Sequence, residues 1–158
     1  MKNTNLILNS DIVQQKLESL RKLEDERIYC RHNLSHFFDV ARICYILCLE
    51  NKLPVNKDLI YTTAILHDLG REDQMTDGTS HEIASVAFAE KCLAWTDFDE
   101  EEKNLILQAI AHHRKKDDNI SFASLFYKAD KLSRDCFNCK AYDSCYWSDE
   151  KKNNEVKY

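Results

Sequence analysis

Glycine and proline are scarce in this chain, which has two glycines and one proline among its 158 residues. Tight turns between β-strands rely on these residues, and no segment alternates apolar and polar side chains over the length of a strand. Apolar residues recur instead at intervals of three and four, which is the spacing of amphipathic helices. The sequence therefore predicts an all-helical protein.

Long apolar runs are absent as well. No segment approaches the roughly 20 apolar residues that a membrane-spanning helix needs, and the apolar run near Met1 is too short for a signal peptide. We therefore expect a cytoplasmic protein with no membrane partner. The net charge of −5 provides no basic surface for nucleic acid, so no nucleic-acid partner is expected either.

The periodic segments predict about six helices in a single domain. They are expected to start at Ser10 or Asp11, at Leu34, after Asn56, at Thr79, at Asp97 or Asp99, and at Ser121. Thr79 and Glu82 match the Thr-x-x-Glu capping box, and Gly70 and Gly78 enclose a predicted polar loop. The chain would then consist of an N-terminal helix within 1–27, a bundle over 28–134, a cysteine-rich segment over 135–150 and a flexible tail over 151–158.

Histidines and aspartates lie on the apolar faces of several predicted helices, among them His36, His67 and Asp130. A single buried polar group usually has a neighbouring partner, and for Asp130 an ion pair with Lys131 or Arg134 would suffice. Here several helices each direct such a group toward the core. A shared divalent cation is the simplest common partner for all of them.

Five motifs containing these residues follow one another in a defined order. They are His36-x-x-x-Val40-Ala41, Ala64-Ile65-Leu66-His67-Asp68-Leu69-Gly70-Arg71, His81-Glu82, Ile110-Ala111-His112-His113 and Lys128-Ala129-Asp130-Lys131. In their order, spacing and helical setting, they resemble the HD-domain superfamily of metal-dependent phosphohydrolases. The resemblance covers residues 28–134 and implies a helical HD-domain bundle.

The resemblance also implies which residues bind metal. The primary ligands would be His36, His67, Asp68 and Asp130. Asp68 would bridge to a second ion, and His81 with either His112 or His113 would hold that ion or contact phosphate. The cofactor would be one or two divalent ions of iron, manganese, zinc, nickel or magnesium. His32, one turn before the first ligand, would either join the site, lie behind it or be exposed.

Hydrolysis of a phosphate bond requires an oriented water molecule and positive charge. A bound divalent cation acidifies its water and polarises a phosphoryl oxygen, and Asp68 is the residue expected to orient that water. The candidates for binding phosphate are Arg71, Arg114, Lys131 and Arg134. Lys131 is also a candidate catalytic residue. The expected partner is a small phosphate-containing substrate, similar to a nucleotide.

Two branches of the superfamily resemble parts of the chain more closely. Residues 129–134 resemble a stretch of the enzymes that split diadenosine tetraphosphate symmetrically, but Asn33 replaces the arginine expected three residues before the first metal histidine. Glu72 and Asp73 resemble the Glu-Asp pair of the guanosine tetraphosphate hydrolases, displaced by one position. A solvated loop pair is the other interpretation of these two residues.

Cysteines cluster after the last aspartate. Cys136, Cys139 and Cys145 form a Cys-x2-Cys-x5-Cys pattern, and Cys30 is expected at the same end of the bundle. Four thiolates suit zinc or an iron–sulfur cluster as a second metal site. The alternative is a C-terminal flap in which reduced cysteines pack with aromatic side chains. The other cysteines, Cys44, Cys48 and Cys92, are expected in the core.

The leading functional prediction is an enzyme that hydrolyses a phosphoester or phosphoanhydride bond of a nucleotide-like molecule. The alternative is a catalytically silent module of the same fold, which binds metal or nucleotide and senses redox state or metal through its cysteines. The enzyme is favoured because every motif residue needed for hydrolysis is present. The sequence leaves the oligomeric state open, a homodimer included.

Overall fold

The structure, a computed structural model, describes all residues from 1 to 158 and contains helices but no strands. Its elements are α1 (Lys2–Leu8), α2 (Asp11–Leu23), α3 (Leu34–Glu50), α4 (Lys57–Leu66), α5 (Arg71–Thr76), α6 (His81–Leu93), α7 (Glu100–His112), α8 (Phe122–Leu132) and the 3-10 helix η1 (Cys136–Asn138). The all-helical prediction is confirmed. The six expected helices are α2, α3, α4, α6, α7 and α8, and α1 and α5 are additional.

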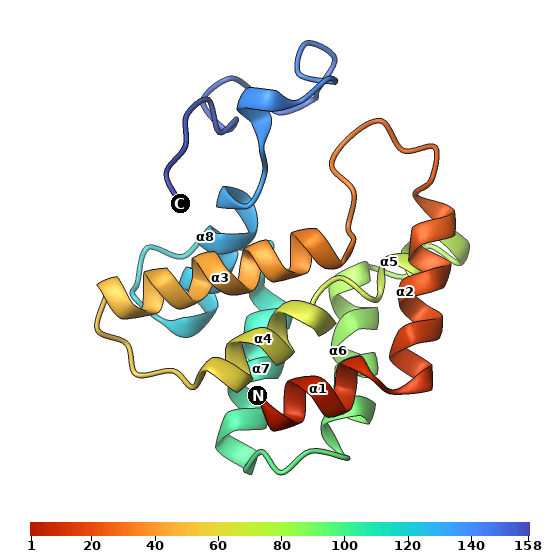
Figure 1. Ribbon diagram of the computed structural model, residues 1–158, viewed down its shortest axis with the longest axis vertical. Helices are drawn as coiled ribbons and strands as arrows, with labels where there is room; N and C mark the ends of the chain where they lie inside the picture. The colour runs from red at the N-terminus through yellow and green to blue at the C-terminus, as the bar shows by residue number, and fades with distance from the viewer.

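Helix α3 crosses the molecule and packs against α4 and α8, whereas α7 packs against α4, α6 and α8 (Figure 1). Phe37, Leu47, Ile65, Ile106 and Phe126 are almost fully buried in the core that these helices share. Burial of apolar surface stabilises such a core by about 25 cal/mol for each Å² removed from water. None of the helices combines the length and apolar character that crossing a membrane requires.

Asp58, in the first turn of α4, holds α1 against the bundle. Its carboxylate accepts hydrogen bonds from the backbone N–H groups of Asn3 (2.9 Å) and Thr4 (2.8 Å). These are donors that the start of a helix leaves unpaired. Burial alone would raise the pKa of Asp58, but the Thr4 hydroxyl and the two N–H groups lower it. A tertiary contact therefore fixes α1, which its own sequence does not predict.

Helix α5 occupies the segment for which the sequence predicts a polar loop. Lys16 of α2 has its Nζ 2.8 Å from both Glu72 and Asp73, and the Ser19 hydroxyl donates to Glu72 at 2.6 Å. Acidic side chains in the first turn also suit the helix dipole. Glu72 and Asp73 thus hold α5 against α2 and are not a solvated loop pair.

The prediction of a Thr79–Glu82 capping box at the start of α6 is wrong. Ser80 is the N-cap residue of α6, and its side chain makes no capping hydrogen bond. The backbone N–H of Thr79 donates to Asp77 Oδ1 at 2.8 Å, and Glu82 pairs with Arg114. Because Thr79 belongs to the turn before the helix, α6 starts at His81.

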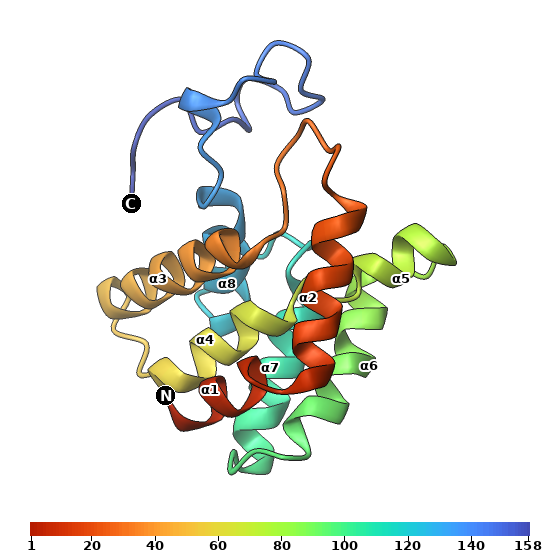
Figure 2. The ribbon, with the colours of Figure 1, turned by 45° about the vertical axis from the view of Figure 1, so that its right-hand side comes forward.

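The cysteine-rich segment lies beyond the end of α8, at the same end of the molecule as the loop between α2 and α3 (Figures 1 and 2). The Tyr29 hydroxyl donates to the backbone oxygen of Ser144 at 3.1 Å, and the rings of Tyr29 and Tyr146 meet edge to face at 6.2 Å. The tail, for which the sequence predicts flexibility, has an anchor at Asn153, whose amide donates to two carbonyl groups at the end of α8.

Gly70 allows α6 to approach the turn that follows α4. A Cβ atom on Gly70 would lie 2.4 Å from Ser85 N, 2.5 Å from His81 O and 2.8 Å from Ala84 C. These are backbone atoms of a helix, so they cannot rotate away as a side chain could. We expect Gly70→Ala to lower the free energy of unfolding by about 3 kcal/mol, measured by chemical denaturation.

Gly78→Ala is the matched control for this substitution. Gly78 has a φ of +83°, but a Cβ atom there would meet nothing within 4 Å. Its cost is therefore that of the left-handed backbone alone, about 1 kcal/mol. Equal destabilisation by the two substitutions would contradict the close approach of α6 to Gly70.

Candidate metal centre

Six histidine and aspartate side chains from five helices converge inside the bundle. His36 comes from the first turn of α3, His67 and Asp68 from the turn after α4, His81 from the start of α6, His113 from the end of α7, and Asp130 from α8. All six are more than nine-tenths buried. Asn33 determines where the first of these helices begins, because its side chain accepts the His36 N–H at 3.1 Å.

Each of the four histidines has a hydrogen-bond partner at Nδ1. The partners are the Ser133 hydroxyl for His36 (3.1 Å), Ala64 O for His67 (2.7 Å), Gln74 Oε1 for His81 (2.9 Å) and Ile110 O for His113 (2.5 Å). The Ser133 hydroxyl donates to a backbone carbonyl, so it accepts from the imidazole. With its proton on Nδ1, a neutral imidazole presents Nε2 as a lone pair, as metal-binding histidines do.

The first group of ligand atoms surrounds Nε2 of His36 and of His67. His36 Nε2 lies 3.4 Å from Asp130 Oδ1 and 3.9 Å from Asp68 Oδ2. His67 Nε2 lies 3.3 Å from Asp68 Oδ2 and 3.9 Å from Asp130 Oδ1. Ligand atoms of His36, His67 and Asp68 all lie within 4.8 Å of one another. The structure thus brings together the four residues predicted as primary ligands.

The second group shares Asp68 with the first. Asp68 Oδ1 lies 3.4 Å from His81 Nε2 and 3.6 Å from His113 Nε2. The two Nε2 atoms are 3.1 Å apart, and both rings already donate a hydrogen bond through Nδ1. The lone pairs on the two Nε2 atoms therefore face each other unless a proton or a cation lies between them. Asp68 presents one oxygen to each group, which is the arrangement of a bridging carboxylate.

Three buried side-chain polar atoms of the chain have no hydrogen-bond partner: His67 Nε2, Asp68 Oδ1 and Arg71 Nε. Such atoms are rare in folded proteins because leaving one unpaired costs about 1–3 kcal/mol. All three lie at the two ligand groups. Imidazole nitrogen and carboxylate oxygen together suit divalent iron, manganese, zinc or nickel. The two acceptors, His67 Nε2 and Asp68 Oδ1, fit a divalent metal, whereas Arg71 Nε is a donor that lies 2.9 Å from Asp68 Oδ1 without the geometry of a hydrogen bond.

The electrostatics of the cluster favour protonation states that bind metal. Burial alone would raise the pKa of Asp68 and of Asp130, but the adjacent histidines and arginines lower both well below the usual value. Burial is the main reason that the pKa of His36 falls to about 4 and that of His81 to about 3. Burial also opposes the charge of His113, but Asp68 raises the pKa of this ring overall. Metal binding requires ionised carboxylates and neutral imidazoles, so the shifts of Asp68, Asp130, His36 and His81 favour it and that of His113 opposes it.

His32 and Glu24 form a buried pair beside the first group. His32 Nδ1 donates to Glu24 Oε1 at 2.6 Å, and the His32 backbone N–H donates to Glu24 Oε2 at 2.6 Å. Nε2 of His32 lies 3.8 Å from Asp68 Oδ2. His32 is therefore a fifth imidazole at the cluster and not an exposed residue. Sequence reasoning missed Glu24, because a lone glutamate eight residues before a histidine forms no recognisable pattern.

His112 is not part of the cluster. Its side chain is exposed, and its Nδ1 lies 2.8 Å from Gln108 O on the same helix. Successive helical residues point about 100° apart, so His112 and His113 cannot both face the core. The prediction of His112 as a ligand is wrong, and His113 is the member of the pair that lies in the second group.

The predicted phosphate-binding residues all line one cavity. Arg71 Nε lies 2.9 Å from Asp68 Oδ1, Lys131 Nζ lies 2.6 Å from Asp130 Oδ2, and Arg134 Nη2 lies 3.3 Å from Asp130 Oδ1 and 3.1 Å from His36 Nε2. Arg114 is more exposed and pairs with Glu82 at 3.3 Å. The first three therefore contact the ligand groups directly, whereas Arg114 lies toward the surface.

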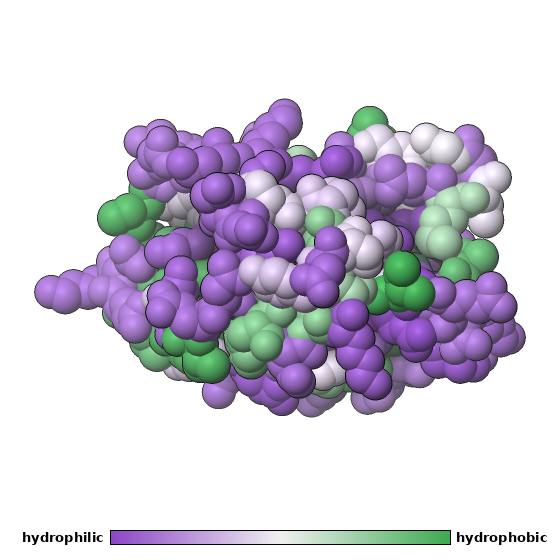
Figure 3. All heavy atoms as spheres, turned by 90° about the horizontal axis from the view of Figure 1, so that it is seen from above, coloured by the Kyte–Doolittle hydropathy of each residue, from purple (hydrophilic) through white to green (hydrophobic).

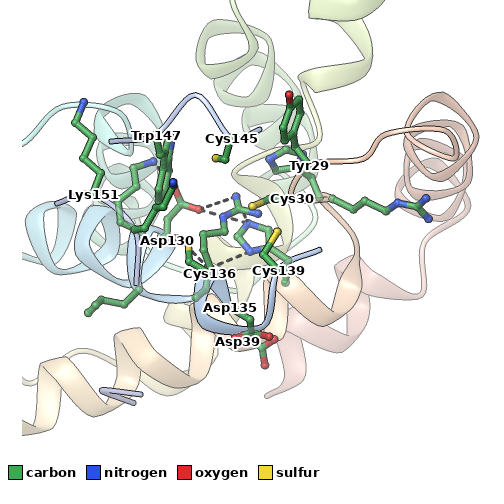
Figure 4. A pocket seen from close by; sticks show the side chains of 18 of the residues that line it. Tyr29, Cys30, Asp39, Asp130, Asp135, Cys136, Cys139, Cys145, Trp147 and Lys151 are labelled. Atoms are coloured by element: carbon green, nitrogen blue, oxygen red, sulfur yellow. Dashed lines mark hydrogen bonds and ion pairs between the residues drawn. The ribbon is translucent and has the colours of Figure 1, made fainter. Parts of the chain in front are cut away.

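The cavity has a volume of about 920 Å³, and His36, His81, His113 and Asp130 of the ligand groups lie along its wall. Ten lysines and arginines line it, against three aspartates, although the chain as a whole carries a net charge of −5. Its aromatic side chains are Tyr29, Tyr127, Tyr142, Tyr146 and Trp147. Figure 4 shows Trp147 and Tyr29 on either side of this lining, with Asp130 next to Trp147. The cavity thus offers positive charge and flat apolar surfaces together.

A family model described as "HD domain" matches residues 33–135. The chain belongs to the HD-domain family. It is 48% identical over 159 aligned residues to an uncharacterized protein of Clostridium beijerinckii, with 100% of each chain covered. The crystal structure of a predicted HD superfamily hydrolase from an uncultured Thermotogales bacterium has a similar fold, with a TM-score of 0.66 and 19% identity over 92% of this chain and 81% of that chain.

The HD-domain match includes both ligand groups and ends before the cysteine-rich segment. Its boundaries leave out Glu24 and His32, which reach the HD site from the loop before α3. They also leave out Cys30, Cys136, Cys139 and Cys145, whose thiols are free and line the HD cavity. The remaining cysteines, Cys44, Cys48 and Cys92, are buried in the core as predicted.

We expect Asp68→Asn to lower the affinity for divalent metal at least about tenfold, because the substitution removes one anionic ligand from each group. Isothermal titration with Mn²⁺ would measure the change. Asp39→Asn is the matched control, since Asp39 borders the same cavity from α3 but pairs with Arg42 at 3.0 Å. Equal affinities in the two variants would contradict a site built on Asp68.

Proposed function

We propose that this HD-domain protein is a metal-dependent phosphohydrolase that cleaves a phosphoester or phosphoanhydride bond of a small, nucleotide-like molecule. Membership of the family supports the general activity. The observation that carries the proposal is that His36, His81, His113 and Asp130 of the metal-ligand groups line a cationic cavity. A substrate whose phosphates enter this cavity would meet the ligand groups directly.

The lining of the cavity supports an anionic substrate with a flat ring. An excess of seven cationic over acidic residues in the lining creates a local positive field in a chain of opposite net charge. Aromatic side chains stack on bases with little dependence on base identity. A volume of about 920 Å³ lies within the usual range for small-molecule sites. Phosphate charge and a base would thus each find a complementary surface.

A bound divalent cation supplies an acidified water and a positive charge for a phosphoryl oxygen. The protein contributes the orientation of the groups around that water. Arg71 forms an ion pair with the Asp68 carboxylate at 2.9 Å. Glu24 keeps the His32 proton on Nδ1, so that Nε2, 3.8 Å from Asp68, is free to accept a proton. Lys131 extends from Asp130 into the cavity, where its ammonium group neutralises charge on the departing phosphate.

Arg134 connects cation binding with phosphate binding. Its guanidinium donates to His36 Nε2 at 3.1 Å and to Asp130 Oδ1 at 3.3 Å, and it is almost fully buried. When His36 and Asp130 hold a cation, Arg134 must give up these contacts. Its planar group of donors is then available for a phosphate in the same cavity, which guanidinium binds with two parallel hydrogen bonds.

The activity can be tested with purified protein, Mn²⁺ or Fe²⁺, and a panel of mono-, di- and dinucleoside polyphosphates. We expect release of phosphate or nucleoside phosphate, and a loss of kcat of about a thousandfold or more in Asp68→Asn, with the helical circular dichroism signal retained. If metal binds tightly and no nucleotide is hydrolysed, the enzyme proposal fails. The silent metal- or nucleotide-binding module would then be the correct interpretation.

Lys131 provides a second test that leaves the metal ligands intact. We expect Lys131→Ala to lower kcat/KM about a hundredfold, as removal of one stabilising donor does in other active sites, with unchanged metal affinity. Lys91→Ala is the control, because Lys91 is exposed on α6 and absent from the cavity. An unchanged kcat/KM would show that Lys131 serves only as the ion-pair partner of Asp130.

A further inference from the structure

The segment after α8 contains three of the seven cysteines of the chain, and neither the HD domain nor the proposed hydrolysis explains them. Cys136, Cys139 and Cys145 lie outside the HD-domain match, which ends at residue 135. Cys30 joins them from the loop before α3, far away in the sequence. All four carry free thiols and line the same cavity.

Figure 4 shows the four cysteine side chains around one part of the cavity, next to the hydrogen bonds between Asp130 and its neighbours. Burial raises the pKa of the Cys30 thiol; Arg134 opposes this effect, and the thiols of Cys136, Cys139 and Cys145 raise the pKa further. Four thiols from two distant segments therefore face a common space. When deprotonated, such thiols are ligands for a soft metal centre.

The C-terminal segment has little else to hold it in place. From residue 135 onward its only regular element is the three-residue helix η1, and only Cys136 and Ala141 are buried. The side chains of Phe137 and Tyr146 are 50% and 78% exposed. Seen from this end, the surface is mostly hydrophilic, with separate apolar groups between polar ones (Figure 3). Segments without a core of their own are usually held by disulfides or metals, and this one has no disulfide.

The spacing of the sulfur atoms distinguishes between metal centres. A single tetrahedral zinc ion with bonds of about 2.3 Å holds its sulfurs about 3.8 Å apart. The structure contains two groups of three ligand atoms within 4.8 Å of one another, and both consist of histidine and aspartate. No three cysteine sulfur atoms lie within 4.8 Å of one another. An iron–sulfur cluster lies between its four thiolates and keeps them farther apart than one ion does.

We propose that Cys30, Cys136, Cys139 and Cys145 ligate an iron–sulfur cluster that fastens the C-terminal segment to the loop between α2 and α3 at the rim of the HD cavity. Both segments contribute aromatic residues to the cavity, Tyr29 from the loop and Trp147 from the C-terminal segment. The cluster therefore holds together the wall on which a flat ring would stack. This centre is separate from the histidine–aspartate ligand groups and does not rest on their proposed activity.

The test is the iron and acid-labile sulfide content of protein purified without oxygen. We expect bound sulfide, a brown colour with broad visible absorption, and an electron paramagnetic resonance signal of a cluster after reduction. Cys139→Ala removes sulfide and colour, whereas Cys92→Ala, at a buried core cysteine of α6, retains both. Asp68→Asn also retains both, because sulfide reports on the cluster and not on the histidine–aspartate site.

A second measurement covers the case in which Cys139→Ala does not fold. Treatment of the wild-type protein with ferricyanide and an iron chelator is expected to bleach the colour and to make residues 135–150 sensitive to protease, while the helical circular dichroism signal persists. Equimolar zinc without sulfide would overturn the cluster, and so would disulfides or four free thiols without iron. If the colour bleaches but residues 135–150 stay resistant to protease, the cluster does not hold the C-terminal segment in place.

Discussion

The structure depends on how five buried imidazoles are hydrogen-bonded. Each ring in the site, those of His32, His36, His67, His81 and His113, has an acceptor at Nδ1, so each presents Nε2 toward Asp68 or Asp130. Although Arg71, Lys131 and Arg134 lie against the carboxylates, His67 Nε2 and Asp68 Oδ1 have no hydrogen-bond partner, and unpaired acceptors are costly in a buried site. A divalent cation is the partner that satisfies them together, and Asp68, with one oxygen toward each ligand group, couples the two halves of the site.

The fold supplies the acceptors that fix these rings. His67 and His113 bond to carbonyl groups of the helices that they terminate, so helix ends set their orientation. His36 relies on Ser133 after α8, and His32 on Glu24 after α2. Gly70 brings the start of α6, and with it His81, close to the turn that carries Asp68. The packing of α3, α4, α6, α7 and α8 therefore determines the protonation pattern as well as the positions of the ligands.

Much of this arrangement follows from local sequence patterns. Asn56, Ser121 and one of the two alternatives Asp97 and Asp99 mark helix starts correctly, and the ordered histidines and aspartates identify five of the six residues of the buried cluster. The remaining features are tertiary. Helix α1 depends on Asp58 and α5 on Lys16, and neither partner is a neighbour in sequence. The choice between His112 and His113 depends on a rotation of about 100° at a helix end, where periodicity is weakest.

His36, His67, Asp68 and Asp130 are expected to bind one divalent ion, and Asp68 to share a second ion with His81 and His113. Anomalous diffraction from crystals grown with Mn²⁺ tests this most directly. We expect a strong peak between the Nε2 atoms of the first group, a second peak between those of His81 and His113, and Arg134 withdrawn from His36. A map without a peak at either group, with Arg134 still bonded to His36, would contradict this expectation.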